Sequence, residues 1–277
     1  MNFFVIKDRI DLVLYNIFNI ISDCVFMFRF EIKKLVRCNN KFMNIHSGQR
    51  CFILGTGPSL NDLTKEQVDK LKNEVVFATN SIYKASVVES IIPSYYTLVD
   101  NLCWENNTNI YENIMKKYDK QDIMFITSCK AKKIIDKTGI RKNTIFLYSK
   151  KYPTSHINCC IHKNSYITQN VVSSTIRTAM YMGFKEIYLL GCDYTSFLVK
   201  SNHCYDDIEE VEQAETFFKS RYNISSNLAM YLEAYARTTR FHYFLSKYAK
   251  EHKIKIINIT PKSLLDAYPR EDVSIIL

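Results

Sequence analysis

The sequence has little glycine or proline and a single tryptophan, with six, five and one copies in 277 residues. So few chain breakers argue against a disordered, collagen-like or low-complexity chain, and no internal repeat is present. Hydrophobic residues make up 47% of the chain, which is ample for a packed core. The length therefore suits one α/β domain with a short appendage.

Paired metal ligands are also missing. The nine cysteines are an odd number and form no Cys-x-x-Cys pair. Several stand inside apolar runs, so we expect reduced packing residues and a cytoplasmic location rather than a disulfide framework. His203–Cys204 and Cys159–Cys160–His162 imitate zinc-ligand spacing poorly, so we expect no metal site and no bound cofactor.

Acidic charge is outnumbered, and the formal net charge is +9. Such a balance favours anionic partners, although basic surface residues that only keep a protein soluble explain it equally well. We expect a nucleotide and an anionic membrane as partners rather than nucleic acid.

Residues 10–30 lack the uninterrupted apolar run of a spanning helix. The stretch is rich in Ile, Leu, Val and Phe, but Asn16, Asn19 and Asp23 fall on one helical face. No small-x-small cleavage site follows it, which argues against a signal peptide. We predict that residues 1–45 form an amphipathic helical segment.

A basic run follows this helix. Residues 1–50 hold eight basic and four acidic side chains, and the basic run consists of Lys33, Lys34, Arg37 and Lys41. An apolar-faced helix beside basic residues suits peripheral contact with the inner membrane of a bacterium. A helix that packs on the domain, or on a second subunit of a homo-oligomer, is an equal alternative.

Strands alternate with helices from residue 50 onward. Strands are expected at 51–54, 75–78, 95–99, 123–127, 144–148, 187–190 and 254–259, and helices at 64–72, 106–118, 169–182, 206–219 and 225–251. Short apolar strands between helices indicate a parallel sheet covered on both faces. The predicted fold is a doubly wound, mostly parallel, Rossmann-like α/β sheet over residues 46–277. Ligands of such sheets bind beyond the carboxyl ends of the strands.

The first predicted strand leads into a glycine loop, Gly55-Thr56-Gly57-Pro58-Ser59. Glycine lets backbone approach a ligand closely, and Ser59 is placed to cap the next helix, whose free N–H groups favour a phosphate. Leu60 stands where a dinucleotide fingerprint has its third glycine, and the Walker ending is absent. An ordinary tight turn is the alternative. Replacing Gly57 by alanine is expected to abolish nucleotide binding while leaving the fold largely intact.

Polar residues end three further strands. Asn80 follows the second strand and Asp100 and Asn101 follow the third, where they suit ribose hydroxyls or a base edge. Helix caps and Asx-turns are the common alternative for such residues. Asp193 and Tyr194 follow the sixth strand at the edge that carries Gly55.

His203 lies just beyond, in a segment about 195–228 that we predict to be a lid. A neutral histidine there would be able to take a proton from an attacking hydroxyl. Six acidic residues between 206 and 215 indicate a solvated helix face or part of that lid. No Asp-x-Asp occurs, which favours a metal-independent reaction.

The chain resembles the MptE-like family, which includes the motility accessory factors of flagellated bacteria. The matching stretches are residues 50–60, 77–80, 95–100, 182–194 and 257–261. They are also similar to bacterial sialyltransferases of glycosyltransferase family 42. Those sialyltransferases have a Gly-Asn-Gly-Pro-Ser-Leu loop and a Gly-Tyr-Lys-Glu-Ile-Tyr-Leu-Ser-Gly-Ile-Asp segment. Those enzymes transfer sialic acid from a CMP donor, with inversion and without an essential metal.

This resemblance implies functional roles for particular residues. It places Gly55, Thr56, Gly57 and Ser59 at the donor phosphate, and Asn80 and Asp100 near ribose and cytosine. Thr56 replaces the asparagine of the sialyltransferases. Their catalytic histidine aligns with Glu233 or Tyr235, so His203 and Glu233 are both candidates for the base.

Three functions follow from these observations. The first is a metal-independent inverting glycosyltransferase that moves sialic acid or another nonulosonic acid from a CMP donor to a surface glycan of lipopolysaccharide or capsule. The second is the 6-hydroxymethylpterin diphosphokinase activity of archaeal MptE-like proteins, which requires ATP and magnesium. The third is a non-enzymatic nucleotide-binding or assembly protein. We rank the glycosyltransferase first.

Overall fold

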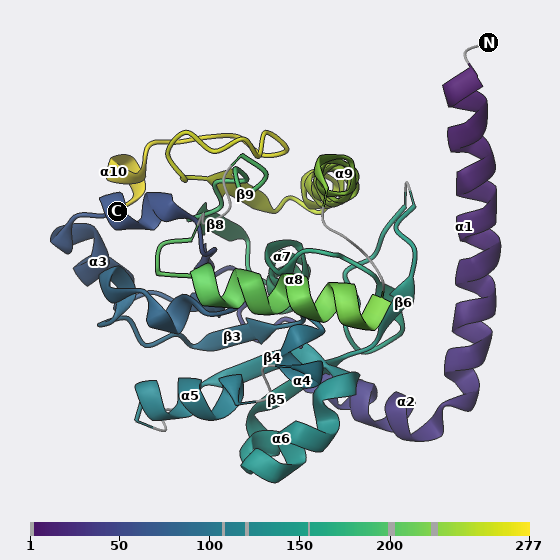
Figure 1. Ribbon diagram of the computed structural model, residues 1–277, viewed down its shortest axis with the longest axis horizontal. Helices are drawn as coiled ribbons and strands as arrows, with labels where there is room; N and C mark the ends of the chain where they lie inside the picture. The colour runs from purple at the N-terminus through teal and green to yellow at the C-terminus, as the bar shows by residue number, and fades with distance from the viewer. Residues whose placement is uncertain (1–2, 107–108, 120–121, 155, 199–202, 223–226) are drawn as a thin grey trace.

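The computed structural model describes residues 3–106, 109–119, 122–154, 156–198, 203–222 and 227–277 (Figure 1). Its centre is a seven-stranded, wholly parallel sheet in the order β5-β4-β3-β2-β1-β8-β9. The strands are β1 (Arg50–Leu54), β2 (Val76–Thr79), β3 (Tyr95–Leu98), β4 (Met124–Ser128), β5 (Thr144–Leu147), β8 (Glu186–Leu190) and β9 (Lys255–Asn258). All seven predicted strands are confirmed, as is the doubly wound fold.

The helices are α1 (Phe3–Phe28), α2 (Phe30–Arg37), α3 (Lys65–Leu71), α4 (Leu102–Glu105), α5 (Ile110–Lys117), α6 (Lys132–Thr138), α7 (Val171–Tyr181), α8 (Ile208–Tyr222), α9 (Leu228–Glu251) and α10 (Val273–Ile276). The helix expected over 106–118 is described as the shorter α5, and α4 precedes that range. Helix α6 and a short parallel pair, β6 (Ser149–Lys151) with β7 (Ser165–Tyr166), were not expected.

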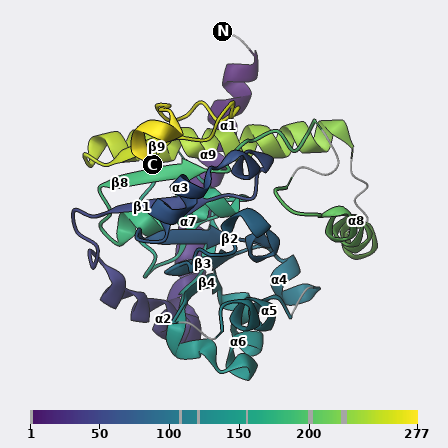
Figure 2. The same cartoon turned by 90° about the vertical axis from the view of Figure 1, so that its left-hand side faces the viewer.

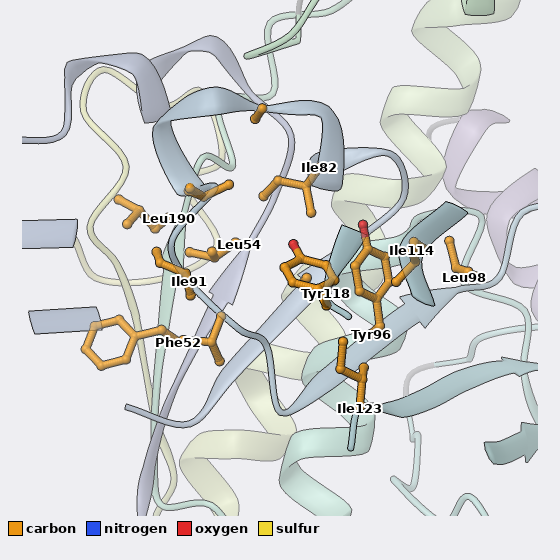
Figure 3. Close-up of a cluster of buried hydrophobic side chains, with 14 of the residues drawn as sticks. Phe52, Leu54, Ile82, Ile91, Tyr96, Leu98, Ile114, Tyr118, Ile123 and Leu190 are labelled. Carbon is orange, nitrogen blue, oxygen red and sulfur yellow. The ribbon is translucent and has the colours of Figure 1, made fainter. Parts of the chain in front are cut away.

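The strands are apolar on both sides because helices cover both faces of the sheet. Along β1, Phe52 and Leu54 face a core completed by α3, α5 and α6, of which Figure 3 shows a part. Cys51 and Ile53 face the opposite core, completed by α7 and α9. This alternation follows from the two-residue period of a strand.

The expectation of buried packing cysteines is met by most of the set, whereas Cys24 and Cys38 are exposed. All nine are free, and five of them are buried: Cys51, Cys103, Cys159, Cys192 and Cys204. Burial raises the pKa of Cys192 to about 12, which keeps this thiol protonated at neutral pH.

Helix α1 stands along one side of the domain, next to β6 (Figure 1). Its polar residues Asn19 and Ser22 are buried against the domain, whereas Ile10, Ile17 and Ile20 are exposed. The alternative in which this helix packs on the domain is therefore confirmed, and the side that packs carries polar residues together with Phe26. By length and composition, Ile6–Phe28 is able to cross a membrane, a reading that the interrupting polar residues had argued against.

Candidate functional site

The crevice of this sheet lies between β1 and β8. The chain leaves β1 toward β2 on one side, whereas β8 continues to β9 on the other, so the strand order reverses between these two neighbours. Doubly wound sheets bind their ligands at such a switch point, outside the carboxyl ends of the strands. The loop that follows Leu54 and the loop that follows Leu190 therefore form the candidate site.

The two loops are bonded directly to each other. The Gly57 N–H donates to the Gly191 carbonyl at 2.8 Å. The Ser59 hydroxyl donates to Asp193 Oδ2 at 2.8 Å, and the Ser59 N–H donates to Oδ1 at 3.2 Å. Burial raises the pKa of Asp193, and the Ser59 hydrogen bonds partly oppose that effect. Both Ser59 donors are therefore occupied by a carboxylate.

The glycines of the first loop are explained by this contact. A Cβ at Gly57 would lie 1.8 Å from Asp193 Oδ2, and one at Gly55 would lie 2.3 Å from the Gly191 carbonyl oxygen. Since real atoms do not approach so closely, a side chain at either position would force the loops apart. These distances argue against the expectation that Gly57→Ala leaves the fold largely intact, which stays a prediction.

The segment after the glycine loop also differs from the prediction. Residues Pro58–Asp62 form a 3-10 turn whose N-cap is Gly57, without a side-chain cap. The α-helix starts later, at Lys65, capped by Thr64 in a reciprocal capping box with Gln67. Ser59 is therefore no helix cap, because its hydroxyl is used by Asp193.

The predicted lid meets the glycine loop through its backbone. The Cys204 N–H donates to the Thr56 carbonyl at 2.8 Å, which brings the neighbouring His203 to the edge of the crevice. Residues 199–202 and 223–226 of the predicted lid lie outside the described residues. The described part therefore ties His203 to the loop expected to bind phosphate.

His203 is paired with a buried acid. Its Nδ1 is hydrogen-bonded to Oδ2 of Asp207, whose side chain is fully buried, while the His203 side chain is one-third exposed. The imidazole also stacks on Tyr205, with ring centroids 5.2 Å apart. A carboxylate on one ring nitrogen fixes the ring and leaves Nε2 as the nitrogen that takes a proton. Sequence reasoning placed Asp207 only in an acidic run. The i, i+4 spacing to His203 was the signal that it missed.

The start of α8 is anchored to the loop after β2. Glu210 Oε1 accepts hydrogen bonds from Ser81 Oγ at 2.9 Å and from Lys84 Nζ at 2.6 Å. Figure 2 shows α8 beside the domain rather than in either layer of helices that covers the sheet. The acidic run is therefore partly an anchor, through Asp207 and Glu210, and partly a solvated face, as at Glu209 and Glu212.

Asn80 is the unusual residue at the end of β2. Its backbone is left-handed, with φ of 46°, and its carbonyl accepts from the Tyr96 hydroxyl at 2.8 Å. Its Oδ1 is buried and has no hydrogen-bond partner among the described residues. A buried acceptor without a partner costs free energy, so a ligand that donates here would bind favourably.

Asp100 and Asn101 have local roles. Asp100 Oδ1 accepts from the Leu102 N–H at 2.9 Å, which is an Asx-turn that starts α4. Asn101 occupies the N-cap position of α4 without a side-chain cap. Both residues lie at the predicted sheet edge, and the turn observed for Asp100 is the alternative left open above.

Tyr194 begins a buried chain of hydrogen bonds. Its backbone is left-handed, with φ of 60°, and its hydroxyl is bonded to Nε2 of His242 on α9. His242 Nδ1 lies 2.9 Å from the Tyr268 hydroxyl. Burial lowers the pKa of His242 to about 3 and raises those of Tyr194 and Tyr268. The three groups are therefore neutral at physiological pH. No sequence pattern pointed to His242 or Tyr268.

The two aligned positions on α9 have different surroundings. Glu233 is exposed and lies 3.7 Å from Arg237, one turn along its own helix. Tyr235 packs edge-on against Tyr194 at 6.0 Å and against Phe197 at 4.9 Å. The structure thus brings Tyr235, rather than Glu233, to the loop that follows β8.

Carboxylates of the crevice do not cluster. Within the described ranges, no group of three or more His, Cys, Asp or Glu side chains is arranged to hold a metal ion. The residues that converge at the switch point are the glycine loop, Asp193 and the His203–Asp207 pair.

Known proteins share the sequence family and the fold. The profile of the family described as 6-hydroxymethylpterin diphosphokinase MptE-like matches residues 22–196. The MAf glycosyltransferase of Magnetospirillum magneticum AMB-1 superposes with a TM-score of 0.50 at 14% identity, over 87% of this chain and 38% of that one. The chain thus spans well under half of that protein's length. No curated protein sequence matches.

Two structures of the sialyltransferase CstII superpose less closely. The one from Campylobacter jejuni, in complex with a substrate analogue, cytidine-5'-monophosphate, has a TM-score of 0.45 at 16% identity, over 81% of this chain and 85% of that one. Monomeric CstII has a TM-score of 0.47 at 17% identity, over 80% and 85%. The shared fold therefore rests on the MAf glycosyltransferase alone, at its TM-score of 0.50.

Proposed function

The chain belongs to the MptE-like family, and on this basis we propose that it is an enzyme that transfers a group from a nucleotide-activated donor at the crevice between β1 and β8. The group that we favour is a sialic or other nonulosonic acid, carried by CMP and moved to a hydroxyl of a surface glycan. The observation that carries the proposal is the pairing of His203 with the buried Asp207. An inverting transfer needs such a base beside the acceptor.

The base chemistry follows from the geometry of this pair. His203 Nε2 takes the proton of the acceptor hydroxyl while the acceptor oxygen bonds to the anomeric carbon. The bond from that carbon to the phosphate oxygen breaks, and CMP leaves with the electron pair. The Asp207 carboxylate, held at Nδ1, stabilises the imidazolium that forms.

The donor is proposed to bind across the ends of β1 and β2. Because Asp193 occupies both Ser59 donors, the phosphate is assigned to Thr56, and Asp193 keeps the loop in shape. The free Oδ1 of Asn80 is placed to accept from a ribose hydroxyl or from the cytosine amino group. Asp100, Asn101 and Tyr194 then shape the walls of the site.

The diphosphokinase is the second candidate, favoured by the description of the family. It would hold magnesium on a triphosphate through carboxylates of the crevice. Asp193 and Asp100 are the acids closest to the strand ends, and each already accepts local hydrogen bonds. This arrangement supports the sugar transfer over the magnesium-dependent reaction.

Nucleotide binding separates these candidates. We expect CMP or CDP to raise the melting temperature of the full chain without magnesium, since a ligand stabilises the state that it binds. A response only to ATP with magnesium would favour the diphosphokinase, and no response to any nucleotide would favour a non-enzymatic assembly protein. Release of CMP from a CMP-linked nonulosonic acid in the presence of a glycan acceptor then tests the transfer itself.

A further inference from the structure

The outward side of α1 is an apolar stripe that nothing in the described chain covers (Figure 1). Its main members are at least half exposed: Ile10, Val13, Ile17, Ile20, Ile21 and Phe28. They recur at the three- and four-residue spacing of one helix face. Contiguous exposed apolar surface of this kind marks an interaction site rather than ordinary solvent-facing surface.

Three polar side chains of α1, Asn19, Ser22 and Asp23, are used on its inner side. Asn19 exchanges two hydrogen bonds with the backbone of Tyr152, at 2.9 and 2.7 Å. Ser22 donates to the Lys150 carbonyl at 3.1 Å, and Asp23 forms an ion pair with Lys151 at 2.8 Å. These bonds fix the rotation of α1 about its axis. The apolar stripe is therefore held outward by the fold.

Cations adjoin the stripe at its C-terminal end. A hollow on the surface of α2 is lined by the exposed Phe30 and by Lys33, Lys34 and Arg37. A second hollow shares Lys33 and Arg37 and adds His162 and Lys163. Neither hollow has an acidic residue in its lining. The cationic surface of α2 thus directly follows the apolar stripe of α1 along the chain.

We propose that the outward stripe of α1 and the basic side of α2 bind the surface of an anionic lipid bilayer, with α1 in the plane of the membrane. Lipid offers acyl chains to the stripe and phosphates to the cations, which matches both parts of the surface. This inference is independent of the proposed reaction.

A second copy of the chain fits the surface less well. A two-stranded coiled coil needs a narrow seam with polar flanks, whereas Leu14 and Ile21 widen the stripe beyond the positions of Val13 and Ile20. Parallel pairing would also bring two sets of Lys33, Lys34 and Arg37 together, with like charges in contact.

The bonds of α1 argue for an in-plane position rather than a spanning one. Ile6–Phe28 would extend about 35 Å, which is long enough to cross the hydrocarbon core. While docked, however, α1 is bonded to the backbone of Lys150 and Tyr152 and to the Lys151 ammonium. Spanning would carry this charged segment, with the edges of the two-stranded β6–β7 pair, into hydrocarbon, where it has no water to bond.

The test is flotation of the full chain with vesicles of phosphatidylcholine, with and without phosphatidylglycerol. Ile17→Glu/Ile20→Glu should lower the affinity by at least about 100-fold, because two side chains lose their burial. Ile275→Glu, at a still more exposed position on α10, is the control and should bind as the wild type does. The replaced side chains are exposed, so melting temperatures should stay unchanged.

Charge is tested separately. Lys33→Gln/Arg37→Gln should weaken binding to phosphatidylglycerol vesicles by roughly 25-fold, at about fivefold for each cation, and less at high salt. Lys65→Gln/Lys142→Gln, which also removes two cations, should have no effect. Wild-type flotation by both α1 and α2 variants would overturn the proposal. The proposal would also be overturned if the wild type fails to float and instead forms a dimer that Ile17→Glu/Ile20→Glu dissociates.

Discussion

Alanine at position 57 would place a methyl group where the carboxylate of Asp193 now lies. The added Cβ would be 1.8 Å from Asp193 Oδ2, 2.5 Å from its Cγ and 2.7 Å from the Gly191 carbonyl oxygen. Asp193 is then forced to rotate away, and both hydrogen bonds from Ser59 are lost. The perturbation therefore separates the two loops of the switch point.

The magnitude follows from these contacts. Each hydrogen bond to a charged acceptor is worth about 1.5–3 kcal/mol, and overpacking costs about 1–3 kcal/mol. Asp193 is only half-buried, so rotation into solvent recovers part of its hydration. We expect the free energy of unfolding to fall by about 3 kcal/mol, which lowers the melting temperature by about 6–12 °C in a chain of this size.

Chemical and thermal unfolding measure this change, and two variants control it. Gly139→Ala introduces the strain of a left-handed residue without any neighbour within 4 Å, so it should cost only about 1 kcal/mol. Gly57→Ala/Asp193→Ala should be less destabilised than the sum of the single changes, because the carboxylate is gone. Additive losses, or a Gly57→Ala protein as stable as the wild type, would refute the reasoning.

Three further predictions concern the site. Asp207→Asn should lower kcat about 10²-fold in steady-state assays, with little change in donor affinity. Glu233→Gln, at an exposed position, should retain near-native turnover. Equal losses of kcat in the two variants would contradict the assignment of His203 as the base. The folded-state pKa of His242 is depressed to about 3, so its contribution to stability is present above the ordinary histidine pKa and is lost as the pH falls toward 3. The wild-type free energy of unfolding should therefore fall between pH 7 and pH 4, and His242→Phe should remove about 3 kcal/mol of that fall in urea unfolding. Asn80→Asp keeps a residue that tolerates the left-handed backbone, so the melting temperature should stay within about 2 °C of the wild type. The affinity for CMP should change at least tenfold in calorimetry. Unchanged affinity would remove Asn80 from the nucleotide site.

The sequence by itself determined the sheet. All seven strands occur at or within one residue of the predicted starts, because runs such as 51–54 and 187–190 are apolar on both sides and only a parallel sheet between helices buries both. The order of the motifs also located the functional edge, since the carboxyl ends of parallel strands lie together. Gly55, Asn80 and Asp193 therefore lie beyond the strand ends where the sequence predicts them.

The tertiary structure alone decided which of these residues touch. Position 57 has no room for a side chain because the Asp193 carboxylate, more than 130 positions away in the sequence, lies against it. Asp207 orients His203, but its burial is not visible in the sequence, where it is one of several acidic residues in a row. The orientation of helix α1 was likewise decided by the tertiary structure. Periodicity showed that it has a polar and an apolar side, but hydrogen bonds to Lys150 and Tyr152 decided that the polar side faces inward. A periodic pattern defines the faces of a helix, and only the partners supplied by the rest of the chain decide which face is buried.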